Sequence, residues 1–88
     1  MVEIEIKKVI RTQKFERNVK AIKDKPTKTR VKKQIKRIIE NPDVGKPMRY
    51  NLKGERSVYV PPFRIIYAVK ECNLYLLRFE HRGKVYRQ

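Results

Sequence analysis

The spacing of apolar residues changes once along this chain, and that change limits the folds it can adopt. Between Thr12 and Asn41, apolar side chains recur every three or four residues, which is typical of amphipathic helices. From Ser57 to His81 they recur every second residue, which is typical of strands with one buried face. The pattern predicts a pair of helices followed by a run of short strands.

The chain is expected to begin with a strand and to continue into a helical hairpin. Residues 2–7 alternate apolar with polar and predict the strand. Thr12 and Thr27 are the expected N-caps of two helices, which a break at residues 24–26 separates. The second helix is expected to end at residues 41–42, because a residue that precedes proline avoids the helical conformation.

The rest of the chain is expected to form an antiparallel meander. Its strands are expected at Tyr50 with Leu52, then 57–60, 63–70 and 74–81. The resulting βααβββ order predicts an α+β fold, with the helical hairpin on one face of an antiparallel sheet and the opposite face open. Residues 1–88 are expected to form a single domain. The tyrosines of this region are interpreted as sheet packing: Tyr50, Tyr59, Tyr67 and Tyr75.

The chain is strongly basic, with 24 Lys and Arg against 9 Asp and Glu and a net charge of +15. This excess opposes compaction by self-repulsion, so we expect an anionic partner, most simply a nucleic-acid backbone. Heat adaptation also enriches Lys, but it normally enriches Glu as well, and in this chain Glu has not kept pace with Lys. The cations of the two expected helices should face solvent: Lys14, Arg17, Lys20, Lys23, Lys28, Arg30, Lys32, Lys33, Lys36 and Arg37.

Cysteine and histidine are too scarce for a disulfide or a zinc site. Cys72 and His81 are single residues of their kinds, so no intrachain disulfide can form and tetrahedral zinc lacks nitrogen and sulfur ligands. We expect no metal and no cofactor. Residues 2–6 alternate and do not resemble the apolar core of a signal peptide, and no apolar run approaches membrane-spanning length. A cytoplasmic location without a membrane partner is therefore expected.

Two regions carry candidate chemistry. Arg64 interrupts an apolar strand, and two interpretations stay open: it pairs with a carboxylate such as Glu80 on the neighbouring strand, or it faces a phosphate on the open sheet face. Residues 81–87 combine an imidazole, two guanidinium groups, an ammonium and a phenol. This segment is either a frayed basic tail or a set of groups suited to cleaving a single strand.

Several segments, taken together, resemble the RelE/ParE toxin superfamily. They are Leu52-Lys53-Gly54, Ser57-Val58-Tyr59-Val60, Phe63-Arg64-Ile65-Ile66-Tyr67, His81-Arg82 and Val85-Tyr86. They follow the family's order over essentially the whole chain. The resemblance, which is to the RelE type, implies a RelE-like fold and a toxin of a type II toxin–antitoxin pair. Such toxins cleave mRNA in the ribosomal A site, without a metal, by attack of the ribose 2′-hydroxyl on the adjacent phosphate.

The resemblance also implies roles for residues. Arg64 would face the scissile phosphate, Arg82 would stabilise charge that develops on the phosphoryl oxygens, and Tyr86 would stack on or orient the nucleotide. His81 is a candidate for proton transfer, since imidazole titrates near neutrality, or a structural residue bonded to backbone. RNA contacts are expected from Lys53, Arg56, Lys84 and Arg87.

One strand departs from the family pattern. Ser57 and Tyr59 occupy positions that are basic in the members with the best-defined chemistry, so no lysine general base is assigned there. A substitute base would be Lys53, Arg56 or His81, and Glu55 is a weaker candidate that is more often only a turn carboxylate. Two alternatives therefore stay open: a ParE-like inhibitor of DNA gyrase and a non-catalytic RNA-binding module. The expected partners are a small acidic RelB-like antitoxin and, for an mRNA-cleaving toxin, the ribosome with its RNA and the mRNA.

Overall fold

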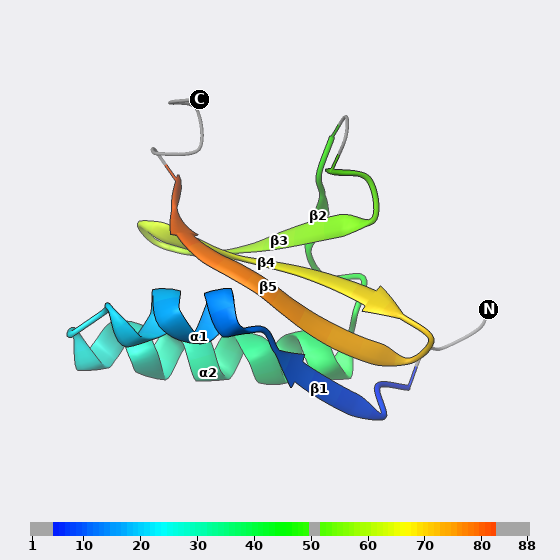
Figure 1. Ribbon diagram of the computed structural model, residues 1–88, viewed down its shortest axis with the longest axis horizontal. Helices are drawn as coiled ribbons and strands as arrows, with labels where there is room; N and C mark the ends of the chain where they lie inside the picture. Colours follow the sequence, from blue (N-terminus) through cyan, green and yellow to red (C-terminus); the bar gives the residue numbers. More distant parts are fainter. Residues whose placement is uncertain (1–4, 50–51, 83–88) are drawn as a thin grey trace.

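Two helices lie against one side of a five-stranded sheet in the computed structural model, which describes residues 5–49 and 52–82 (Figure 1). The elements in chain order are β1 (Lys8–Arg11), α1 (Gln13–Lys20), α2 (Lys25–Glu40), β2 (Lys46–Pro47), β3 (Glu55–Val60), β4 (Phe63–Lys70) and β5 (Asn73–His81). Contacts join α1 to β5 and α2 to β3. The predicted α+β class is confirmed, as is the meander of β3, β4 and β5, and neither described helix lies on the second face of the sheet. The strand expected at Tyr50 with Leu52 is wrong at Leu52, which is not in a strand, and Tyr50 lies outside the described residues.

The strands are arranged in the order β1-β5-β4-β3-β2. Neighbours from β2 to β5 are antiparallel, whereas β1 runs parallel to β5. The expectation of a wholly antiparallel sheet is therefore wrong at this edge. Alternation of apolar and polar residues is the same for both pairing directions, so the sequence pattern carried no signal for the direction of β1.

The first strand also lies later than predicted. Residues 5–7 are not in a strand, and residues 1–4 lie outside the described residues. Instead β1 pairs from Lys8 with Asn73 to Arg11 with Leu76. Only Ile10 of this described edge strand is even half-buried. Its position is therefore set by the backbone of β5 rather than by an apolar face of its own.

Capping side chains fix where the two helices begin. Thr12 caps α1 as predicted, and its Oγ1 accepts a hydrogen bond from the Phe15 amide at 3.2 Å. The cap of α2 is Asp24 and not Thr27: the Asp24 carboxylate accepts from the Thr27 amide at 3.1 Å. Pro26 fits in this first turn because no backbone N–H is required there. The predicted break at residues 24–26 is thus the start of α2, which ends at Asn41 as predicted.

The core forms between the helices and the covered face of the sheet. The helices contribute Phe15, Val31, Ile35 and Ile38. From β4, Ile65 and Tyr67 are fully buried in this core. The Tyr67 hydroxyl donates to the Pro42 carbonyl at 2.7 Å and accepts from the Gly45 amide at 2.9 Å, which ties the segment between α2 and β2 to the sheet.

Candidate nucleic-acid interface on the open sheet face

An irregularity in β5 decides which of its side chains face away from the helices. Tyr67 pairs with Leu76, whereas Ile66 pairs with Arg78, so Leu77 is an extra residue in β5. Such a β-bulge moves every side chain beyond it to the other face of the strand.

The bulge places two charged residues of β5 on the open face. Phe79 lies in the core, so its neighbours Arg78 and Glu80 project from the opposite side of the sheet. Strict alternation from the buried Leu74 and Leu76 would have put both charged residues in the core instead. The bulge is therefore what makes the open face of β5 polar.

Helix α1 satisfies backbone groups at the bulge. The Thr12 hydroxyl donates to the carbonyl oxygens of Leu76 and Leu77, which lie 2.8 and 3.1 Å away. The Asn18 side-chain oxygen accepts from the Phe79 amide at 3.1 Å. A bulge interrupts the regular ladder, so backbone groups there need other partners. The N-cap of α1 thus also holds the bulge in place.

Four charged side chains form a chain of ion pairs across the open face. Arg64 Nη2 lies 3.3 Å from Glu80 Oε2, and Arg78 Nε lies 3.5 Å from Glu80 Oε1. Arg78 Nη2 also lies 2.9 Å from Glu55 Oε1. Glu80 therefore bridges the two arginines, and the two positive and two negative charges cancel. Of the two interpretations of Arg64, the structure contains the pairing with Glu80.

This network covers an apolar residue on the open face. Ile66 is fully buried, although it faces away from the helices. Register places Arg78 beside it on β5, and Arg64 lies two residues away on β4. Long arginine side chains can cover apolar surface with their aliphatic stems. Within this packing the Nε of Arg64 is buried and has no hydrogen-bond partner among the described residues.

Tyr59 lies beside both arginines that the resemblance singled out. It is the cross-strand partner of Arg64, and the Arg82 guanidinium lies over its ring, 5.2 Å from the centroid. Stacking of this kind is a favourable cation–π contact. The Arg82 amide also donates to the Pro62 carbonyl at 3.0 Å, which fixes the backbone there. Arg64, Tyr59 and Arg82 thus meet on the open face.

The interpretation of the tyrosines as sheet packing holds only in part. Tyr67 is buried in the core, and this burial raises the pKa of its phenol. Tyr75 is half-buried. Tyr59 is 51% exposed on the open face, so the interpretation is wrong for this residue. Tyr50 lies outside the described residues.

The other predicted site residues are not gathered with this group. His81 projects from the helix side of β5, where its ring meets Phe63 edge-on at 5.5 Å. Arg56 donates to the Gly45 carbonyl at 2.7 Å and pairs with Asp43 at 3.6 Å. Lys53 is exposed in the turn before β3. The predicted residues beyond Arg82 lie outside the described part of the chain: Lys84, Tyr86 and Arg87.

Arg78 is the residue that sequence reasoning missed. On a regular strand its spacing from Leu74 and Leu76 would place it in the core, where an unpaired cation is costly. That conflict between pattern and residue type was the available signal for a bulge. No three His, Cys, Asp or Glu side chains within residues 5–49 and 52–82 gather as metal ligands. Over the same residues, no helix is long and apolar enough to cross a membrane.

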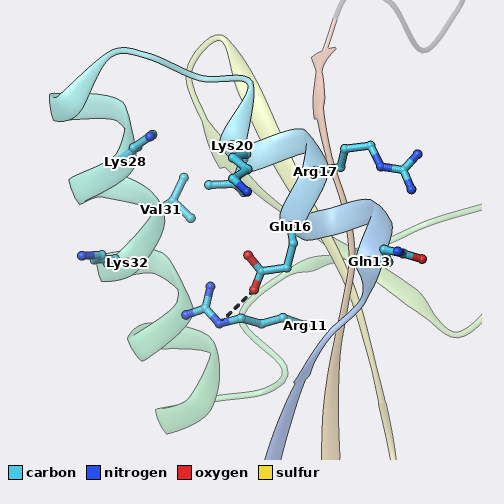
Figure 2. Close-up of a pocket in the computed structure, with 9 residues that line it drawn as sticks. Arg11, Gln13, Glu16, Arg17, Lys20, Lys28, Val31 and Lys32 are labelled. Atoms are coloured by element: carbon cyan, nitrogen blue, oxygen red, sulfur yellow. Dashed lines mark ion pairs between the residues drawn. The ribbon is translucent and has the colours of Figure 1, made fainter.

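A second feature is a basic groove between the two helices, with a volume of about 430 Å³ (Figure 2). Figure 2 shows Val31 of α2 directed toward α1 and Glu16 paired with Arg11. Glu16 Oε2 lies 3.9 Å from Arg11 Nε. The cations that line the groove are Arg11, Arg17, Lys20, Lys28 and Lys32. Exposure of the helix cations is confirmed except at Lys28, which is half-buried. Positive charge thus collects on the helices, whereas the opposite charges of the paired side chains on the open sheet face cancel.

One comparison with known proteins identifies the family, and a second shows the fold. A family model described as ParE toxin of type II toxin–antitoxin system, parDE, matches residues 7–86. The RelBE2 toxin–antitoxin complex of Mycobacterium tuberculosis contains a chain of similar structure (TM-score 0.72, 24% identity), covering 85% of this chain and 96% of that one. A YoeB/ParE toxin from Agrobacterium tumefaciens gives a TM-score of 0.78 at 15% identity, with 86% and 99% covered. The DinJ–YafQ complex of E. coli gives 0.73 at 19% identity, with 94% and 99% covered. A search of curated proteins gives no significant match.

Proposed function

The chain belongs to the ParE toxin family within the RelE/ParE superfamily, and from this membership we propose that it stops translation by cleaving mRNA in the ribosomal A site. It is a toxin of a type II toxin–antitoxin system; the cleavage is the proposal. One observation carries it: Arg64 and Arg82 meet beside Tyr59 on the face of the sheet that the helices leave open. That arrangement combines cations for a phosphate with an exposed aromatic ring for a base.

The proposed reaction needs no group from outside the RNA as nucleophile. The ribose 2′-hydroxyl loses its proton and its oxygen bonds to the adjacent phosphorus, while the bond from phosphorus to the 5′-oxygen breaks. The 5′-oxygen takes up a proton, which leaves a 2′,3′-cyclic phosphate and a 5′-hydroxyl. Arg64 and Arg82 would stabilise the negative charge that grows on the non-bridging oxygens. Tyr86 would stack on or orient the nucleotide, as the resemblance implies.

Proton transfer in this scheme rests on the resemblance alone. His81 lies on the helix side of β5, so the RNA would have to pass around the end of the sheet to reach its ring. The proposed phosphate contacts away from the reacting atoms are Lys53, which is exposed, together with Lys84 and Arg87. Arg56 is held by Gly45 and Asp43, so it would have to leave both to contact RNA.

The proposed partners are a small acidic antitoxin and the ribosome in the cytoplasm. An acidic, partly apolar antitoxin segment suits the basic groove between α1 and α2, which has valines among its cations. The exposed helix cations suit phosphates of ribosomal RNA. The RelBE2 and DinJ–YafQ complexes pair toxins of this fold with antitoxins of their own.

Inhibition of DNA gyrase without RNA cleavage is the second candidate. Two observations favour it: the matching family model is that of ParE, and Arg64 and Arg78 are both neutralised by carboxylates on the open face. A protein that acts on gyrase would not require these arginines to contact a phosphate.

A single experiment separates the two candidates. mRNA breaks are mapped by primer extension in a translating extract that contains the intact toxin, Arg82→Ala or Lys8→Ala. Lys8 is an exposed cation of β1 that pairs with Asn73, at the opposite end of β5 from Arg82, so its variant makes the same charge change away from the proposed site. We expect breaks with the intact toxin and Lys8→Ala but not with Arg82→Ala. Intact mRNA together with blocked supercoiling by gyrase would support the second candidate instead.

A further inference from the structure

Glu80 occupies the position between two arginines that an anion would be expected to occupy. Its two oxygens meet different guanidinium groups, Oε2 with Arg64 at 3.3 Å and Oε1 with Arg78 at 3.5 Å. We propose that Arg64 and Arg78 form a binding site for an RNA phosphodiester, and that Glu80 closes this site until a phosphate replaces its carboxylate. The inference rests on the proposed contact of RNA with the open sheet face and adds Arg78 and Glu80 to it.

The chemistry of the two anions supports the exchange. A carboxylate and a phosphodiester each present two oxygens that accept hydrogen bonds from guanidinium groups, and arginine binds both well. Replacement of one by the other would keep both arginines paired. The Nε of Arg64 has no hydrogen-bond partner among the described residues, so Glu80 does not satisfy this guanidinium completely.

The four exposures indicate which member of the network can move. Glu80 has 29% of its side chain exposed, against 13% for Arg64, 20% for Arg78 and 21% for Glu55. Arg78 is also bound to Glu55 at 2.9 Å, closer than to Glu80 at 3.5 Å. If the Glu80 side chain turns toward solvent, Glu55 therefore still holds Arg78 in position. Glu80 is therefore the carboxylate that leaves the site, whereas Glu55 keeps Arg78 in position.

Movement of Glu80 changes the net charge of the site. With Glu80 in place, the two arginines and two glutamates have no net charge, so a phosphate is only weakly attracted to the site. With Glu80 turned out, the remaining two arginines and one glutamate leave one positive charge at the site. The helices keep their cations in both states. RNA would thus be attracted to the molecule by the helices and admitted to the sheet face only by displacing Glu80.

The test measures RNA binding without cleavage. The probe is a short fluorescent single-stranded RNA with 2′-O-methyl riboses, which removes the attacking hydroxyl, and binding is followed by anisotropy at several salt concentrations. Glu80→Gln should bind the probe about tenfold more tightly, which corresponds to about 1.4 kcal/mol. The slope of log K against log salt should steepen by about 0.7 for each additional phosphate that the protein neutralises.

A matched control separates the site from net charge. Glu71 is an exposed carboxylate in the turn between β4 and β5, so Glu71→Gln makes the same charge change away from the site. It should bind the probe within about twofold of the intact protein, since one distant surface charge is largely screened. Equally tightened binding in Glu71→Gln and Glu80→Gln would overturn the proposal, as would tightened binding that survives Arg78→Gln in the Glu80→Gln protein.

A second variant covers the case in which Glu80→Gln does not fold. Glu80→Asp keeps the charge but shortens the side chain, so the carboxylate withdraws from the arginines and binding should still tighten. If neither folded Glu80 variant binds more tightly, the proposal is wrong. Binding of this probe is independent of the ribosome. Tighter binding without mRNA breaks would therefore reject the proposed cleavage alone, and breaks without tighter binding would reject the role of Glu80 alone.

Discussion

Arg82 and His81 are adjacent in sequence, yet they lie on opposite faces of the sheet. Arg82 stacks on Tyr59 on the open face, whereas His81 packs on Phe63 on the helix side. We expect Arg82→Ala to lower the rate of mRNA cleavage by about 10²- to 10³-fold, as for the loss of a group that stabilises transition-state charge. His81→Gln should lower the rate by less than about tenfold, because the His81 ring lies on the helix side of β5, away from the proposed site. Loss of a group in direct proton transfer would instead lower the rate by about 10²- to 10⁴-fold.

Time courses of primer extension in the translating extract would measure both rates. Equal losses in the two variants would show that His81 takes part in proton transfer in spite of its position.

Tyr67 is a buried titratable residue whose ionisation opposes folding. Burial raises the pKa of its phenol above the usual 10.0, partly offset by the hydrogen bond from Gly45. The group therefore stabilises the fold fully below about pH 10, and this stability is lost as the pH rises through the pKa of the folded protein. Urea unfolding between about pH 8 and pH 11 should show a steep alkaline loss in the intact protein.

Tyr67→Phe is the control for that loss. It removes the hydroxyl that bonds to Pro42 and Gly45, so it should unfold about 1–3 kcal/mol more easily at neutral pH because a buried amide and a carbonyl are left unpaired. Its alkaline loss should be shallower, since the buried phenol is absent. A parallel loss in both proteins would show that Tyr67 does not cause the pH dependence.

At the scale of elements, the N-cap of α1 and the bulge of β5 depend on one hydroxyl. The Thr12 side chain accepts from the Phe15 amide and donates to the carbonyls of Leu76 and Leu77. Thr12→Val should lower the free energy of unfolding by about 1–3 kcal/mol, since a cap and part-buried hydrogen bonds are lost together. Thr29→Val, at an exposed position of α2, should change it by less than about 0.5 kcal/mol. Urea denaturation of both variants measures the difference, and equal effects would show that the bulge does not depend on Thr12.

Elements with a strong local signal were predictable from the sequence. The third meander strand, residues 63–70, matches β4 in both limits because its alternation is long and tight turns flank it. The start of α1 at Thr12 and the end of α2 at Asn41 also match, since caps and proline act locally. In contrast, the position and direction of β1 depend on backbone contacts with β5, which is distant in sequence, and such contacts leave little trace in side-chain patterns. Strand β2 has two residues, which is too short for an alternating pattern.

The candidate site was predictable only in part, and the bulge is the reason. Arg64 and Arg82 followed from motif resemblance, and pairing of Arg64 with Glu80 was one of the two interpretations. Arg78 was missed because Leu77 shifts the alternation by one residue, and the available signal of that shift was an arginine at a position that strict alternation places in the core. Tyr59 was misassigned to sheet packing. Alternation shows that its side chain lies on the opposite side of the sheet from those of its neighbours, but it does not show whether helices cover that side.

At the scale of the whole molecule, the charge of +15 has a cost in stability. Cations crowd the exposed surface of the helices, and salt screens their repulsion over a Debye length of about 10 Å at 0.1 M. The melting temperature of the free toxin should therefore rise as salt is added. Four exposed lysines of the helices offer a direct test: Lys14, Lys32, Lys33 and Lys36. Replacing them with glutamine keeps helix propensity and lowers the net charge from +15 to +11.

This fourfold variant should melt at a higher temperature than the intact toxin at low salt, by about 4–8 °C for each kcal/mol of repulsion removed. The difference should shrink at high salt, where screening already weakens the repulsion in the intact protein. Circular dichroism melts of both proteins across a salt series would measure it. A variant that melts lower at every salt concentration would show that these lysines stabilise the fold. An acidic antitoxin, as proposed above, would relieve the same repulsion, so its binding should raise the melting temperature of the intact toxin more than that of the variant.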